Sequence, residues 1–133
     1  MGSIVIGYVD TPAGNAALEA GIEEARRRER PVVVVSSLLG GRSTGEAETL
    51  ETMEASKRVR ERLESEGIEC EIRDLVRGNT PAEDLIEVSR EIEAELIVIG
   101  IRRRSSTGKL ILGSNALEIL HDATVPVLCV KAT

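Results

Sequence analysis

The sequence predicts a single α/β domain built on a doubly wound parallel β-sheet. Two observations carry this prediction. Five short apolar runs typical of strands alternate along the chain with four segments of helical periodicity, and such alternation is typical of βαβ units with parallel strands. The chain has 133 residues and contains no linker-like tract or internal repeat. We therefore expect one domain over residues 1–133.

The five expected strands are rich in valine and isoleucine. Pro31–Ser37 and Glu95–Gly100 are almost continuously apolar, as expected for strands covered on both faces of a parallel sheet. Ile68–Val76 begins instead with an alternation of apolar and charged residues, which predicts a half-exposed strand near one edge. The first and last strands are expected at Ser3–Val9 and Val125–Lys131.

Four helices are expected between these strands, and most begin with a clear signal. Thr11 and Pro12 provide an N-cap and a first-turn proline for a helix that runs to about residue 28. Ser43 and the glutamate three residues later have capping-box spacing for a long second helix that runs to about residue 66. Thr80 begins the same signal for the third helix, and Gly113 precedes the fourth.

Composition restricts the classes of function. The net charge is −6 and Tyr8 is the only aromatic residue, which disfavours nucleic-acid binding and stacked cofactors such as flavins. Cys70 and Cys129 lie in apolar or alternating runs, so we expect two buried free thiols in a reducing compartment. No signal peptide or membrane-spanning segment is evident, and a cytoplasmic location is expected.

The loop after the fourth strand carries the strongest functional signal. In doubly wound sheets, ligands bind beyond the carboxyl ends of the strands. Gly100 at the strand exit would let a ligand approach the backbone, and Gly113-Ser114 offers helix N–H groups to an anion. Arg102 to Arg104 and Lys109 could supply charge-assisted hydrogen bonds to phosphate. Taken alone, these residues also fit a solvated basic loop before an ordinary helix.

The spacing in this loop resembles a known nucleotide-binding pattern. In the universal stress protein family, a glycine is followed after two residues by another glycine, and after nine more by Gly-Ser or Gly-Thr. Gly100, Gly113 and Ser114 have this separation, although Arg103 occupies the place of the second glycine. The run from residue 115 to residue 130, with its Val-Pro-Val, resembles the family's closing helix and strand. The resemblance covers the whole chain.

The resemblance implies a five-stranded parallel sheet in the order 3-2-1-4-5, flanked by four helices. It implies a stress-associated regulatory protein that binds an adenine nucleotide and forms a homodimer through the last strand, Val125 to Lys131. In the family, an Asp after strand one and backbone after strand two hold the nucleoside, and the glycines and Ser/Thr hold the phosphates. Carried over, the site comprises Val9, Asp10, Ser37, Ile99, Gly100, Arg102, Arg103, Gly113, Ser114 and Asn115.

Two departures leave the ligand open among ATP, AMP and cyclic AMP. Arg103 would occupy or reshape the space of the phosphates, and Val9 replaces the Asp at the nucleoside end. Asp10 is adjacent but would point to the opposite side if the strand pleat continued. A guanidinium at position 103 would favour AMP, cyclic AMP or another anion. The alternative is a nucleotide-free homodimeric interaction module of the same fold.

Catalysis is not expected beyond weak ATP hydrolysis. His121 is the only histidine and is expected near the end of the last helix, in contact with terminal carbonyl groups. Gly108-Lys109 suggests a P-loop, but Arg103 and Leu110 occupy positions where that motif needs glycine and Ser/Thr. No spacing of Cys, His or acidic residues suggests a metal site.

Overall fold

The computed structural model describes residues 2–38, 46–76, 80–101 and 112–132. Strands and helices alternate through this part of the chain, as the sequence predicts. The elements are β1 (Ile4–Gly7), α1 (Pro12–Arg28), β2 (Val32–Leu38), α2 (Glu46–Ser65), β3 (Cys70–Val76), α3 (Pro81–Glu91), β4 (Leu96–Ile101), α4 (Ser114–Asp122) and β5 (Val127–Lys131).

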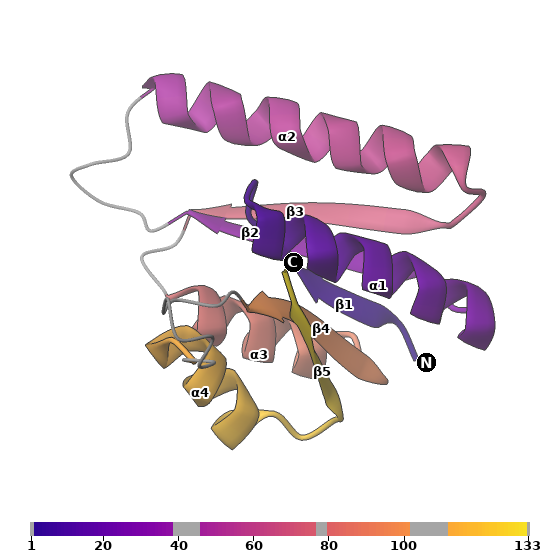
Figure 1. Ribbon diagram of the computed structural model, residues 1–133, viewed down its shortest axis with the longest axis vertical. Helices are drawn as coiled ribbons and strands as arrows, with labels where there is room; N and C mark the ends of the chain where they lie inside the picture. The colour runs from indigo at the N-terminus through magenta and orange to yellow at the C-terminus, as the bar shows by residue number, and fades with distance from the viewer. Residues whose placement is uncertain (1, 39–45, 77–79, 102–111, 133) are drawn as a thin grey trace.

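The five strands form one parallel sheet in the order β3-β2-β1-β4-β5, which confirms the predicted order. β1 lies in the centre, where Val5 is in register with Val33 of β2 and with Ile97 of β4. The chain winds from β1 out to β3 and then returns to build β4 and β5 on the other side (Figure 1). The winding therefore reverses between β1 and β4, where ligands bind in sheets of this kind.

The helices cover the sheet in two layers, with α1 and α2 on one face and α3 and α4 on the other (Figure 1). Successive side chains of β1 pack alternately into the two helix layers. Ile4 and Ile6 pack with Leu63 of α2 in one buried cluster, and Val5 packs with Leu85 of α3 in the other. Each fully buried aliphatic side chain of this size contributes roughly 1.5–3 kcal/mol to folding.

The predicted helix starts at Thr11 and Thr80 are confirmed. The Thr11 hydroxyl oxygen accepts a hydrogen bond from the Gly14 N–H at 3.1 Å. The Thr80 oxygen accepts from the Glu83 N–H at 3.1 Å, and the Glu83 carboxylate accepts from the Thr80 N–H at 2.7 Å, which completes a capping box. The expected cap at Ser43 lies outside the described residues.

β3 is a half-exposed edge strand, as its pattern predicts, and burial alternates from Ile68 to Ile72. Cys70 and Ile72 pack partly against the α1–α2 layer, whereas Glu71 is exposed. Both cysteines are free and only half-buried, so they are less enclosed than expected. Burial raises the pKa of both thiols. Within the described ranges, no helix is long and apolar enough to cross a bilayer.

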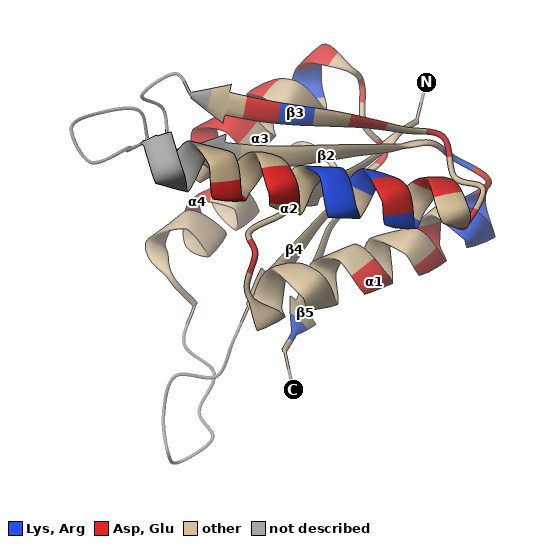
Figure 2. Cartoon of the chain, turned by 90° about the horizontal axis from the view of Figure 1, so that it is seen from above, with Lys and Arg blue, Asp and Glu red and all other residues tan. Residues whose placement is uncertain are grey.

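Ion pairs connect α1 with α2 and the residue that follows it, and Figure 2 shows charged residues along both helices. Arg62 of α2 pairs with Glu19 of α1, its two terminal nitrogens lying 2.5 and 2.9 Å from the carboxylate oxygens. Arg26 of α1 pairs with Glu66, just beyond the end of α2. Because the side chains of these pairs are partly or largely exposed, each contributes at most about 1 kcal/mol.

Candidate functional site

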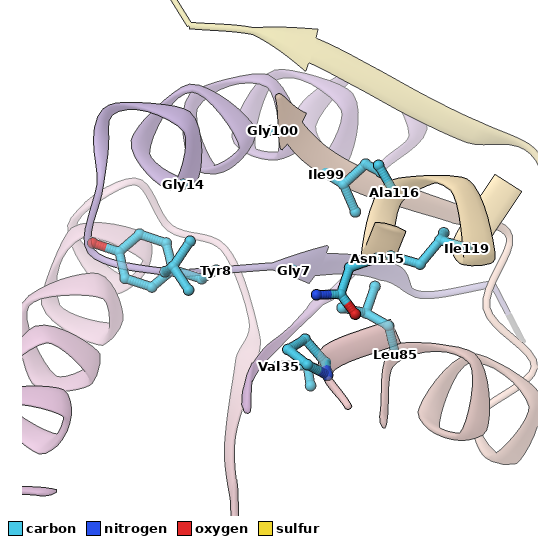
Figure 3. Close-up of a pocket in the computed structure, with 12 residues that line it drawn as sticks. Gly7, Tyr8, Gly14, Val35, Leu85, Ile99, Gly100, Asn115, Ala116 and Ile119 are labelled. Atoms are coloured by element: carbon cyan, nitrogen blue, oxygen red, sulfur yellow. The ribbon is translucent and has the colours of Figure 1, made fainter. Parts of the chain in front are cut away.

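A pocket of about 200 Å³ opens at the carboxyl end of the sheet, where the winding reverses (Figure 3). It lies between the ends of β1, β2 and β4 and the first turns of α1, α3 and α4. Most of its lining is apolar, as in pockets that bind small organic ligands. The lining residues are Gly7, Tyr8, Val9, Gly14, Val35, Pro81, Leu85, Ile99, Gly100, Asn115, Ala116 and Ile119.

Two glycines of the pocket allow α1 to begin directly against the sheet. A Cβ atom on residue 100 would lie 1.8 Å from the Ala13 carbonyl oxygen, and one on residue 14 would lie 1.7 Å from the Val9 carbonyl oxygen. Both contacts involve backbone, so no side-chain rotation could relieve them. The sequence suggests that Gly100 makes room for a ligand. The structure shows instead that the space beside its Cα is filled by the first turn of α1.

The start of α4 presents uncapped backbone donors next to the pocket. Gly113 is the N-cap residue and α4 has no side-chain cap, in contrast to α1 and α3. A Cβ atom on Gly113 would meet no described atom within 4 Å, so the described part of the fold leaves this position open. The first N–H groups of a helix and its dipole favour an anion. Any negative group that enters here therefore meets donors that no described side chain occupies.

Asn115 joins this helix start to the start of α3. Its Oδ1 accepts a long hydrogen bond, 3.4 Å, from the Ala82 N–H in the first turn of α3. The side chain extends from α4 toward Leu85 and Val35 (Figure 3). Because Oδ1 is directed to α3, the amide group can donate elsewhere. The N-terminal ends of two helices thus converge on one side of the pocket.

The opposite side of the pocket is built by the end of β1. The Tyr8 side chain points away from Leu85 and Asn115 (Figure 3) and belongs to the core under α1 and α2. Its hydroxyl donates to Asn15 Oδ1 at 3.1 Å and lies 3.5 Å from Asp10 Oδ1. Burial, followed by the nearby Asp10 charge, raises the pKa of Tyr8.

Asp10 lies outside the pocket lining. Its Oδ2 is 3.2 Å from the Arg58 guanidinium of α2, so the carboxylate is directed toward the α1–α2 side of the sheet. Both side chains of this pair are largely exposed. Val9, which precedes Asp10, lines the pocket and is 52% exposed.

The structure brings four of the predicted site residues together in the lining: Val9, Ile99, Gly100 and Asn115. Gly113 and Ser114 precede Asn115 and are exposed outside the lining. β2 contributes Val35, two residues before Ser37, and the Ser37 side chain is outside the described residues. Arg102 and Arg103 also lie outside the described residues.

Sequence reasoning missed the part of the lining that comes from α3 and the interior of α4. Pro81 and Leu85 belong to the first turns of α3, and Ala116 and Ile119 belong to α4. The capping box at Thr80 marks a helix start at the carboxyl end of the sheet, and this signal could have directed attention to Pro81. The apolar residues themselves have the periodicity of ordinary core positions.

His121 lies away from the pocket lining, in the last turn of α4. Its Nδ1 is 2.7 Å from Asp122 Oδ1, and this hydrogen bond raises the pKa of the imidazole. The described side-chain contact is therefore with Asp122, whereas the sequence predicts a contact with terminal carbonyl groups. Within the described ranges, no group of three or more Cys, His or acidic side chains has the arrangement of a metal site.

Comparison with known proteins identifies the family to which the chain belongs. The sequence model of the universal stress protein family matches residues 1–131. The chain belongs to that family. A curated universal stress protein from Mycolicibacterium smegmatis is 41% identical over 128 residues, which cover 96% of each chain.

Two solved structures from Archaeoglobus fulgidus share the fold along almost the whole chain. One universal stress protein is 39% identical with a TM-score of 0.87, and the match covers 98% of this chain and 99% of that one. Another, solved in complex with dAMP, is 32% identical with a TM-score of 0.81 and 98% coverage of both chains.

Proposed function

We propose that this universal stress protein binds an adenine nucleotide in the pocket between β1 and β4 and acts as a regulator in the stress response. The phosphate would lie at the start of α4, near Gly113, Ser114 and Asn115. The nucleoside would occupy the apolar pocket beside Val9 and Val35. Selection among ATP, AMP and cyclic AMP would depend on the loop that contains Arg102 and Arg103.

The uncapped start of α4 beside an apolar pocket carries this proposal. An apolar cavity alone accepts many ligands, and a helix start alone is not a binding site. Together they offer anion donors and an apolar surface within the reach of one small molecule. A nucleotide has this combination of a charged phosphate and a flat, weakly polar base. The related Archaeoglobus fulgidus protein that was solved with dAMP supports the same ligand class.

The proposed activity is binding rather than catalysis. A general base has to lie within hydrogen-bonding reach of the reacting group. The only histidine, His121, lies at the far end of α4 and contacts Asp122. The Asp10 carboxylate, next to Val9 in the chain, is directed to Arg58 on the other side of β1. These placements support a regulatory binding protein with at most weak ATP hydrolysis.

The proposal includes a cytoplasmic homodimer that forms through Val125 to Lys131. Among the described elements, β5 pairs with β4 on one side only, and Val127, Leu128, Cys129 and Val130 are all only half-buried. A second copy of β5 would cover this apolar edge and complete its backbone hydrogen bonds. Light scattering should give twice the chain mass, and Leu128→Lys should shift the protein toward the monomer.

Isothermal titration with AMP, dAMP, ATP and cyclic AMP tests nucleotide binding, and Gly113→Asp tests its location. The new carboxylate would cap α4 and place a negative charge where the phosphate is expected, so affinity should fall at least about tenfold. The free energy of unfolding should stay unchanged or rise by about 0.5 kcal/mol.

Leu50→Asp is the matched control, because it adds the same charge at an exposed position on α2. It should leave nucleotide affinity unchanged. If none of the four nucleotides binds at millimolar concentration, the interaction-module alternative replaces this proposal. If they bind but Gly113→Asp has no effect, the phosphate does not lie at α4.

A further inference from the structure

Among the described residues, the wall of the pocket beside β1 offers no free side chain that would recognise a sugar hydroxyl. With a phosphate at the start of α4, the sugar and base of a nucleotide have to lie toward the opposite wall. That wall consists of Gly7, Tyr8, Val9, Gly14 and Val35. Gly7 and Gly14 have no side chain, and Val9 and Val35 present aliphatic ones.

The one polar side chain of this wall is already engaged and points elsewhere. The Tyr8 hydroxyl donates to Asn15 at 3.1 Å on the α1 side of the sheet. The Tyr8 side chain belongs to the core, and only 7% of the residue is exposed. Turning the hydroxyl into the pocket would require moving the ring out of that core.

Asp10, the nearest carboxylate along the chain, is also directed away. Its two oxygens face the Tyr8 hydroxyl and the Arg58 guanidinium, and Asp10 does not line the pocket. Two of the local backbone groups have partners as well. The Tyr8 N–H donates to the Val35 carbonyl at 3.0 Å, and the Val9 carbonyl accepts from the Thr11 N–H at 2.8 Å.

Discrimination between two sugars requires a polar group that loses its partner when the hydroxyl is missing. A site built to hydrogen-bond a hydroxyl rejects the analogue that lacks it by several orders of magnitude, whereas an apolar surface discriminates weakly. Val9 provides an apolar surface at this position. The described wall therefore contains no side chain that would be left unsatisfied by a deoxyribose.

We infer that the site does not select between ribose and 2′-deoxyribose, with Val9 as the residue that sets this tolerance. The inference rests on the proposed function and deepens it, because it specifies which part of the nucleotide is not recognised. The protein binds AMP and dAMP with the same affinity, and an acceptor at position 9 creates a preference for AMP.

The test is the ratio of the AMP and dAMP dissociation constants, measured by titration calorimetry on the full chain. For the wild type the two constants should agree within about fivefold. Val9→Asp should raise the preference for AMP to about tenfold or more, because the carboxylate can accept the 2′-hydroxyl. The ratio of the AMP and dAMP constants is the readout, because the negative charge of the new carboxylate should lower the affinity for both nucleotides equally.

Two further variants make the result specific. Asp10→Asn should leave the ratio of the AMP and dAMP constants at its wild-type value, because this carboxylate is directed to Arg58. Leu50→Asp, the charge control on α2, should leave the ratio of the two constants at its wild-type value.

Three outcomes overturn the inference while nucleotide binding stands. These are a wild-type preference for AMP of more than about fivefold, an unchanged ratio in Val9→Asp, and a selective loss of AMP affinity in Asp10→Asn. If neither nucleotide binds to the wild type, the proposed function itself fails and the inference falls with it.

Discussion

The carbonyl oxygen of Ala13 lies 1.8 Å from the position that a Cβ atom on residue 100 would take. The first turn of α1 therefore rests directly on the end of β4, and only glycine fits at position 100. Gly113, at the start of α4, has no described atom within 4 Å of its Cβ position. Gly100 and Gly113 belong to one sequence motif, but their surroundings in the structure differ: the first has no room for a Cβ atom and the second does.

Gly100→Ala should destabilise the protein strongly. The added methyl group meets backbone rather than a movable side chain, so α1 or β4 has to shift, at a cost of about 3 kcal/mol. Gly113→Ala is the matched control and should cost less than about 1 kcal/mol, since its φ of −73° suits any residue. Urea unfolding measures both. Equal losses in the two variants would contradict the close contact at Gly100.

Thr80→Ala should lower the free energy of unfolding by about 1 kcal/mol. The substitution removes the side-chain acceptor for the Glu83 N–H and leaves the capping box half complete. Thr124→Ala, at an exposed turn position, provides the control for loss of a threonine side chain. Urea unfolding should give different free energies of unfolding for the two variants, and equal values would argue against the cap.

Tyr8 should titrate above its ordinary pKa of about 10 in the folded protein. Burial disfavours the phenolate and the Asp10 charge adds to this effect. Because the folded pKa is raised, the associated stability is complete below about pH 10 and is lost as the pH rises toward the folded pKa. Absorbance near 295 nm reports Tyr8 alone, since it is the only aromatic residue.

In urea the tyrosine midpoint should return to about 10. Tyr8→Phe should lack this part of the alkaline loss of stability. A folded midpoint equal to the unfolded one would show that the ring is not enclosed.

His121 should have a pKa above its ordinary value of about 6.5. The hydrogen bond to Asp122 favours the imidazolium, so the stabilising contribution is present below about pH 6.5 and disappears as the pH rises through the folded pKa. Because the chain contains one histidine, an NMR titration needs no assignment. Asp122→Asn should bring the midpoint back down. No change in that variant would place the cause elsewhere.

Much of the fold is readable from local signals in the sequence. The capping box at Thr80 and the N-cap at Thr11 act through residues three positions away, so they are visible without tertiary contacts. The alternation at the start of Ile68–Val76 predicts a half-exposed edge strand, and in the structure Cys70 and Ile72 pack against one helix layer while Leu75 packs against the other. The strand order follows from the family resemblance rather than from these local patterns.

The candidate site is less readable, because its walls are defined by distant segments. The sequence places Asp10 beside Val9, but only the structure shows that Asp10 contacts Arg58 of α2, 48 residues later. Leu85 and Val35 look like ordinary core residues, and their place in the pocket depends on how α3 starts against β2.

The sequence by itself determined the alternation of strands and helices and the helix starts at Thr11 and Thr80. These features depend on short-range periodicity and capping. The tertiary structure alone decided why residue 100 has to be glycine and that the Asp10 carboxylate contacts Arg58 of α2. Those outcomes depend on contacts between segments that are far apart in the chain, and such contacts leave no local pattern to read.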